Sequence, residues 1–418
     1  MTDVPYLLKS YETVLVNAGL WQDFNLLTIP LAVYDGTNTY LWNHPSPPSD
    51  FEKLADGSNV YLSSGRHPSL VANSVAEING TNTATVFYVK DEQRREIDDW
   101  LPLLAHEAFH VYQRDYLENR GANEADLFLY PFDDAHLLTW RRLETYALRK
   151  ALSASAEEGK AGWAQVALDY RNRRFGAMQE AFVTYERGTE LIEGTATYVE
   201  YKVAAKSPDL KNFAATKVRQ RGYETGAAFC FLLDEFTMGW QERLMSDNQS
   251  SLDGLLGETL SESTRKGIDR RELGAIANQA QRDVEQLRLE RKEKRTTFDN
   301  AEGWKLILLS NDADLLRVEE FDPLNVAIVE GGVLHERYLN LAASATQVEI
   351  LNAQCLTEAR GDHPLFSGVK LATINLKDKP KISKDGEVVR IESDSVNGTV
   401  SASAVAIWGR HIEIGISN

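Results

Sequence analysis

The sequence predicts an α+β protein, because a strand-rich segment, a long helical segment and a second strand-rich segment follow one another. Residues 26–90 are rich in β-branched and aromatic residues separated by turn signals. Residues 95–298 show sustained apolar spacing of about 3.6 residues. Residues 299–418 again contain short segments rich in β-branched residues, separated by Gly, Asp and Asn. The pattern therefore predicts a first domain over residues 1–298 and a β-rich C-terminal domain over residues 299–418.

Composition and charge limit the possible partners. The chain has 418 residues, of which 43% are hydrophobic, so it can bury sizeable cores. Its formal net charge of −17 repels phosphate backbones and anionic lipids, so we expect neither nucleic acid nor a membrane as a partner. No signal-peptide pattern and no run of about 18 apolar residues is present, which predicts a cytoplasmic location. A secreted chain without its signal peptide would look the same. The oligomeric state stays open.

The N-terminal part combines one helix with several short strands. Residues 3–20 have the spacing of an amphipathic helix that Gly19 ends. Strands are predicted over residues 28–34, 39–42, 60–63 and 83–89. Residues 76–88 resemble a hairpin with an Asn79-Gly80 turn. If its second strand is an exposed edge, an extended peptide can pair with it; an edge covered by the protein itself is the alternative.

The stretch from Leu103 to Tyr112 contains the motif that dominates the functional prediction. On a helix, His106 and His110 lie on one face, where two imidazoles can bind one Zn²⁺, and Glu107 can reach a water on the metal. This is the H-E-x-x-H pattern of zinc-dependent hydrolases. The alternative interpretation is two surface histidines on an amphipathic helix.

Two helices are predicted between this motif and the next candidate ligand, over residues 137–152 and 163–182. Arg171, Arg173 and Arg174 gather on the second. They can bind a substrate carboxylate as guanidinium forks do, or form a solvated or salt-bridged helix face.

The segment from residue 186 to residue 200 supplies acidic candidates for a third zinc ligand. A His₂Glu set is a known catalytic arrangement, and Glu193 is the candidate, with Glu190 one turn away as its rival. Gly194 and Ala196 are expected to let this helix approach the metal helix closely. Glu190 and Glu200 are candidates for holding the histidines by their other ring nitrogens.

His106-Glu-x-x-His110 followed by Glu193-Gly-x-Ala resembles the gluzincin superfamily of zinc peptidases. Ile192 stands where the aminopeptidase-like members have asparagine, and the interval between the motifs is longer here. The resemblance implies a zincin-like catalytic domain and a peptide or protein substrate. It also implies that His106, His110 and Glu193 hold Zn²⁺ while Glu107 acts as general base. We therefore expect a zinc metallopeptidase, although Mn²⁺ or Co²⁺ also suits such ligands.

Residues 222–236 are similar to the Tyr-x-x-Gly helix that follows the third ligand in many peptidase-MA-like proteins. The resemblance implies that the Tyr223 hydroxyl faces the substrate, where a neutral phenol is a reasonable oxyanion donor. A tyrosine packed beside Gly222 and Gly226 at a helix crossing is the alternative.

The last third of the chain carries no catalytic constellation. A charged helix with one apolar stripe is predicted over residues 261–298. Strands follow over residues 304–309, 315–320, 326–330, 333–341, 346–351, 369–376, 388–392 and 400–416. Cys230 and Cys355 are expected to be buried and unpaired.

Three other functions share part of this pattern. A zinc hydrolase of a non-peptide bond would use the same residues. A non-catalytic protein that keeps zinc for structure predicts a closed site with four protein ligands. An interaction protein without metal predicts no zinc at all.

Overall fold

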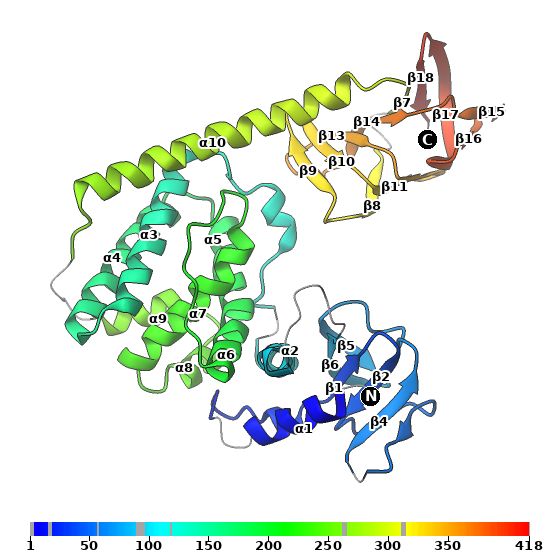
Figure 1. The fold of residues 1–418 in the computed structure, drawn as a ribbon. Helices are drawn as coiled ribbons and strands as arrows, with labels where there is room; N and C mark the ends of the chain where they lie inside the picture. Colours follow the sequence, from blue (N-terminus) through cyan, green and yellow to red (C-terminus); the bar gives the residue numbers. More distant parts are fainter. Residues whose placement is uncertain are drawn as a thin grey trace. The chain divides into compact units, whose positions relative to one another are not determined.

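A computed structural model describes most of the chain and confirms the α+β class (Figure 1). The described residues are 4–15, 19–56, 58–88, 97–117, 119–260, 266–310 and 315–417. Helices and two separate β-sheets make up the fold. Within these residues, no helix is both long and apolar enough to cross a bilayer.

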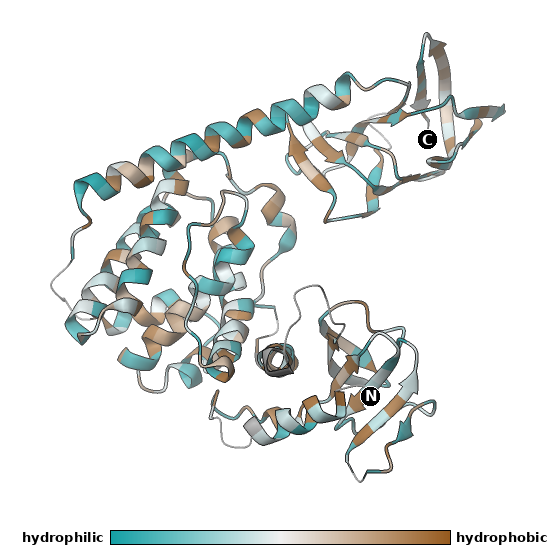
Figure 2. Cartoon of the chain, in the orientation of Figure 1, coloured by the Kyte–Doolittle hydropathy of each residue, from teal (hydrophilic) through white to brown (hydrophobic). Residues whose placement is uncertain are grey.

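The chain divides into two compact units. The N-terminal unit comprises Met1–Asn123 and Ala135–Ala280, and the C-terminal unit comprises Glu124–Asp134 and Gln281–Asn418. The division falls inside helix α10 (Arg270–Asp299), whereas the sequence places it after residue 298. Helix α10 is mostly hydrophilic (Figure 2), and Ile276, Ala280 and Val284 form the buried stripe that its spacing predicts.

The N-terminal unit contains a six-stranded sheet in the order β3-β4-β2-β1-β6-β5. Its strands are β1 (Leu31–Tyr34), β2 (Asn38–Trp42), β3 (Glu52–Lys53), β4 (Val60–Ser64), β5 (Ser74–Ile78) and β6 (Thr81–Phe87). Strands β1 and β6 pair in parallel, and the other neighbours are antiparallel.

The predicted hairpin is present as β5 and β6. Asn79 and Gly80 form its turn with positive φ angles of 43° and 76°, the conformation that a two-residue hairpin turn requires. The condition that its second strand is an exposed edge is not met, because β6 pairs with both β1 and β5. The first strand of the hairpin, β5, is instead the terminal strand at this end of the sheet, and β3 is terminal at the other end. Residue 89, which the sequence assigns to the second strand, lies outside the described residues.

Helices form the rest of the N-terminal unit. They are α1 (Val4–Leu15), α2 (Ile97–Tyr116), α3 (Ala135–Ser153), α4 (Glu157–Phe175), α5 (Glu180–Thr189), α6 (Thr195–Ala204), α7 (Val218–Phe236), α8 (Trp240–Ser246) and α9 (Leu252–Thr259), with a 3₁₀ turn η1 (Leu26–Thr28) and a π-helical turn η3 (Glu190–Gly194). The first predicted helix ends earlier than residue 20, and Gly19 has the expected left-handed conformation. The predicted helix over residues 163–182 is two helices, because α4 ends at Phe175.

An aromatic cluster packs the metal-motif helix against distant segments. The Trp21 ring lies 4.9 Å from Phe109 of α2 and 5.1 Å from Trp240 of α8, measured between ring centroids. Tyr198 of α6 completes the cluster at 6.1 Å from Trp21. Tilted and edge-on arrangements at such distances suit the aromatic quadrupole, so the cluster fixes α2 and α6 side by side.

Charged residues also fill part of the helical core. Arg171 and Arg174 of α4 are completely buried and ion-paired, whereas Arg173 is exposed and stacks over Tyr170. The salt-bridged alternative is therefore correct for two of the three arginines. We call the whole group the buried ion cluster: Arg171, Arg174, Arg221, Glu144, Glu186, Glu190 and Asp253.

The C-terminal unit is built on a twelve-stranded sheet whose main path is β8-β11-β12-β17-β18-β7-β14-β13-β10-β9. Its strands are β7 (Trp304–Leu309), β8 (Arg317–Phe321), β9 (Val326–Val329), β10 (Gly332–His335), β11 (Tyr338–Ala343), β12 (Thr346–Leu351), β13 (Cys355–Ala359), β14 (Val369–Leu376), β15 (Lys381–Asp385), β16 (Val388–Glu392), β17 (Val396–Trp408) and β18 (His411–Ile416). The predicted strands are present, but residues 333–341 form two strands, β10 and β11, and residues 400–416 belong to two strands, β17 and β18. Strands β13 and β15 were not predicted. Cys355 is buried and free, as is Cys230 of α7, as predicted.

The C-terminal unit also holds the short segment that follows the metal-motif helix. The 3₁₀ turn η2 (Glu124–Phe128) belongs to this unit. The Phe128 ring packs edge-on against Phe321, 6.0 Å between centroids, and His363 Nε2 lies 3.0 Å from the Ala125 carbonyl oxygen. His363 thus contributes to packing within the unit.

We predict that Arg171→Met lowers the free energy of unfolding by about 3–5 kcal/mol, because it leaves the buried Glu190 without its ion-pair partner and removes one of the two arginines that bind Asp253. Arg173→Met, on the exposed face of the same helix, is the control and should change stability by less than about 0.5 kcal/mol. Urea unfolding of both variants measures the difference. Equal losses would contradict a special role for the buried arginine.

His335 gives the C-terminal unit a pH-dependent stability. Burial lowers the pKa of His335 to about 4 from the ordinary 6.5, and its Nε2–H donates to Thr357 Oγ1 at 3.2 Å. Because the unfolded chain takes up the proton first, stability falls as pH decreases from 6.5 to about 4, by about 3 kcal/mol in total.

Replacing His335 with Gln removes the titrating group and should flatten this pH dependence. Hydrogen exchange of peptides from β10 and β13, measured in urea between pH 4 and pH 7, reports the local unfolding free energy. An identical pH slope in parent and variant would rule out His335 as the cause.

Candidate metal centre

The H-E-x-x-H motif lies in the second half of helix α2, facing the interior of the N-terminal unit. His106 and Glu107 are buried, and His110 is partly buried. The four-residue spacing places both imidazoles on one helix face, with their Nε2 atoms 3.1 Å apart. The two ring nitrogens therefore point to one place, as the sequence predicts for His106 and His110.

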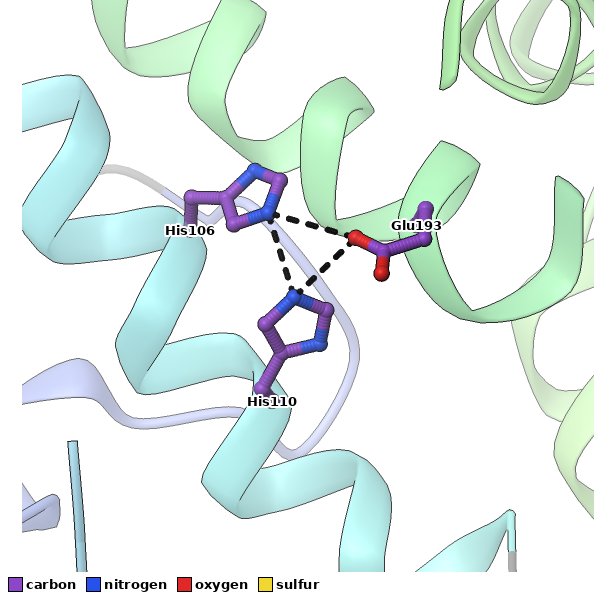
Figure 3. Close-up of side chains that lie close together, drawn as sticks. All are labelled: His106, His110 and Glu193. Carbon is purple, nitrogen blue, oxygen red and sulfur yellow. Dashed lines mark hydrogen bonds and ion pairs between the residues drawn. The ribbon is translucent and has the colours of Figure 1, made fainter. Parts of the chain in front are cut away.

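Glu193 completes a triad of ligand-type atoms (Figure 3). Its Oε2 lies 3.5 Å from His110 Nε2 and 3.8 Å from His106 Nε2. Ligand atoms about 2.0–2.1 Å from a tetrahedral zinc ion lie about 3.3–3.4 Å from one another. The three separations are close to the edges of such a tetrahedron, so this donor set fits a zinc ion.

Glu190, the rival candidate, lies elsewhere. Its carboxylate is buried in contact with the Arg171 guanidinium and accepts a hydrogen bond of 2.7 Å from Thr225 Oγ1. It contacts neither histidine of the triad. The structure thus brings Glu193 to His106 and His110, and places Glu190 in the buried ion cluster.

Helix η3, which carries Glu193, packs against α7 through glycine. A Cβ atom added to Gly194 would lie 2.5 Å from Gly226 Cα, and one added to Gly226 would lie 2.5 Å from the Glu190 carbonyl oxygen. Only glycine permits such an approach of two backbones. The expectation that Gly194 serves the approach to the metal helix is therefore wrong, because its bare face meets α7.

Both histidines are held by their Nδ1 atoms. His106 Nδ1 donates to Glu200 Oε2 at 3.0 Å, which is one of the two predicted acceptors. His110 Nδ1 donates to Gln113 Oε1 at 2.6 Å. These bonds keep an Nδ1 proton on the far side of each ring and leave both Nε2 atoms facing the candidate ion, as metal-ligating histidines require.

Gln113 is the positioning residue that the sequence analysis missed. Its Nε2 donates to the Ile192 carbonyl oxygen at 2.8 Å and to Thr195 Oγ1 at 2.7 Å. One side chain therefore orients His110 and ties α2 to the segment that carries Glu193. Its position three residues after His110, on the same helix face, is the signal that could have identified it.

The electrostatics of the triad favour a cation. Burial opposes a charge on His106, but hydrogen bonds with Glu193 and Glu200 raise its pKa to about 9. Burial likewise opposes ionisation of Glu193, yet the two histidines and Arg219 hold the pKa of this carboxyl well below its usual range. Burial raises the pKa of Glu107, which suits a carboxyl that must accept a proton.

Tyr223 and Arg219 of α7 lie beside the triad. The Tyr223 ring stacks on His106, with centroids 6.3 Å apart and planes 15° apart. Burial and the nearby Glu193 charge raise the pKa of its phenol, so the hydroxyl stays protonated. Arg219 Nη2 donates to Glu193 Oε1 at 2.7 Å, which leaves the other carboxylate oxygen for an ion.

A pocket of about 980 Å³ opens over these residues. Its lining includes the triad, Glu107, Gln113, Glu200, Arg114, Arg219 and Tyr223, together with Asn73, Ser74, Val75 and Asn82 of the β5–β6 hairpin and its approach. The candidate ion site therefore lies in the wall of a cavity that is large enough for a small molecule or a segment of a peptide.

Comparison of the chain with known proteins finds no similar protein. No protein-family model matches the chain, and no curated protein and no solved structure matches it. The functional argument therefore depends on the residues themselves.

We predict that Gln113→Ala lowers zinc affinity by about 10- to 100-fold, because His110 loses the group that orients its ring. Competition with a chromophoric chelator measures the dissociation constant. Gln165→Ala is the control, since Gln165 bonds Asp169 of its own helix. Unchanged zinc affinity in the Gln113 variant would show that the bond does not support the site.

Proposed function

We propose that this protein is a zinc-dependent hydrolase, and specifically a metallopeptidase. One observation carries the proposal: the triad of His106, His110 and Glu193 lies in the wall of a pocket that also contains Glu107. A structural zinc site has four protein ligands, whereas three ligands beside an open cavity are typical of a catalytic one. The resemblance to gluzincins supports the same assignment.

His106, His110 and Glu193 would hold Zn²⁺, which when bound supplies a Lewis acid and lowers the pKa of bound water to about 7. Glu107 accepts the proton of the attacking water, since its raised pKa brings it nearer to neutrality. It then delivers the proton to the leaving amine. Tyr223 donates its phenolic hydrogen to the oxyanion, a role that its protonated state allows.

The position of β5 favours a peptide over another substrate. Ser74 and Val75 of this terminal strand line the pocket, and β5 pairs on one side with β6. Among the described strands, none covers its other side. A terminal strand offers backbone donors and acceptors to an extended chain, so a peptide can pair with it beside the triad.

The other functions predict different outcomes. A hydrolase of a non-peptide bond would use the same site residues and differ only in substrate. A scaffold with structural zinc requires a fourth protein ligand, and the described residues supply a three-membered cluster. The presence of Glu107 in the pocket also favours catalysis, because a structural site does not need that base.

We predict that zinc-loaded protein cuts peptides and that Glu107→Gln lowers the rate by at least about 100-fold while retaining zinc, because only the general base is lost. Mass spectrometry of a diverse peptide mixture detects the cuts and shows whether they are internal or terminal. His110→Ala should lose zinc as well as activity.

Full activity of Glu107→Gln would exclude this mechanism. If neither protein cuts any peptide, the peptidase proposal fails. Zinc content, measured by atomic absorption, then separates a zinc protein of another function from a protein without metal.

A further inference from the structure

Arg114 extends the functional face of the metal helix by one more turn. It lies four residues after His110 and eight after His106, so all three side chains follow one face of α2. The same pocket contains all three. Arg114 is therefore placed in the cavity at about one helical turn, roughly 6 Å along the axis, beyond the nearer histidine.

Two neutral acceptors fix the Arg114 guanidinium. Nη1 donates to Asn82 Oδ1 at 3.1 Å, and Nη2 donates to the Val75 carbonyl oxygen at 3.2 Å. Both acceptors belong to the β5–β6 hairpin. Arg114 thus has a defined position, and among the described side chains no carboxylate lies within 4.0 Å of its guanidinium.

The Val75 carbonyl places this guanidinium on the free edge of β5. Val75 is opposite Ala84, and the Ala84 N–H donates away from β5, to the Pro30 carbonyl oxygen at 3.0 Å. Hydrogen-bonded and non-bonded pairs alternate in an antiparallel ladder, so Val75 and Ala84 form a non-bonded pair. The Val75 carbonyl therefore points outward, where Arg114 occupies it.

A peptide that follows this edge of β5 therefore meets a cation at Val75, where Arg114 already bonds the carbonyl oxygen. The guanidinium has five N–H donors, and the two bonds to the hairpin use two of them. The group that best fits the remaining fork is a carboxylate, which accepts two parallel bonds.

We infer that Arg114 forms a subsite for a carboxylate of the peptide substrate. This inference rests on the proposed peptidase function and specifies its substrate class. The carboxylate belongs either to the C-terminus of the peptide or to an Asp or Glu side chain, and both present the same chemistry. Arg114 is then a specificity residue that touches substrate outside the reacting atoms.

Peptide binding to zinc-loaded Glu107→Gln tests the subsite without turnover. The probes are four fluorescent eight-residue peptides. They combine a C-terminal acid or amide with Asp or Asn at an internal position. Fluorescence anisotropy gives the dissociation constants. Removing the recognised carboxylate should weaken binding by about 2- to 5-fold, since Arg114 is exposed and solvent screens an ion pair there. Amidation and Asp→Asn substitution separate the two sources.

A second protein carries Glu107→Gln together with Arg114→Gln, which removes the charge but keeps an amide donor for the hairpin. It should bind all four peptides equally weakly, and Arg114→Lys should restore part of the preference. Arg173→Gln is the matched control, because it removes the same charge from an exposed position on α4. It should preserve the full preference for the carboxylate.

Several results would overturn the inference. If the parent binds acidic and neutral peptides with equal affinity, the subsite is excluded. If Arg114→Gln lowers the affinity for every peptide by the same factor, the subsite is also excluded, because Arg114 then only holds α2 against the hairpin. If active protein cuts neutral peptides as fast as acidic ones, the peptidase function stands and the subsite fails. If no peptide is bound or cut, both proposals fail.

Discussion

The candidate site depends on the π-helical turn at Glu190–Gly194, because that turn sends two glutamates in different directions. In an α-helix, residues three apart differ by about 60° around the axis and share a face. With the wider π turn of about 4.4 residues, the same spacing gives about 115°. Glu190 consequently reaches Arg171 in the core, and Glu193 reaches the histidines of α2. A regular helix would place both carboxylates on one side.

Three sets of contacts hold this turn in position. Arg171 binds the Glu190 carboxylate, and Gly226 lets the turn pack closely against α7 because it has no side chain. From α2, Gln113 donates a hydrogen bond to the Ile192 carbonyl oxygen. A buried ion cluster adds little net stability, because desolvation of each charge offsets most of the attraction. Its fixed geometry is a better explanation for its presence, since a ligand misplaced by about 1 Å no longer completes a metal site.

The sequence was sufficient for features that follow from local periodicity. The spacing of His106 and His110 on α2 and the choice of Glu193 agree with the observed geometry, as does the Asn79-Gly80 turn. The role of Glu190 was not predictable, because the rotation of the turn depends on Arg171, 19 residues away.

Strand order was also beyond the sequence. The hairpin residues alone do not show that β6 pairs with β1, which makes β5 the terminal strand. Gln113 was missed for a different reason. A polar residue after a metal motif resembles any surface residue until its partners, Ile192 and Thr195, are seen beside it.

The two histidines differ in the charge of the groups that accept a hydrogen bond from Nδ1. His106 donates to the Glu200 carboxylate, whereas His110 donates to the neutral amide of Gln113. A carboxylate partner raises the basicity of an imidazole more than an amide does. Burial opposes a charge on His106, but hydrogen bonds with Glu193 and Glu200 raise its pKa to about 9. Near neutral pH a proton therefore occupies the place of the cation in the metal-free chain, and metal binding must release it. The carboxylate that makes His106 a stronger ligand thus also helps it to hold a competing proton.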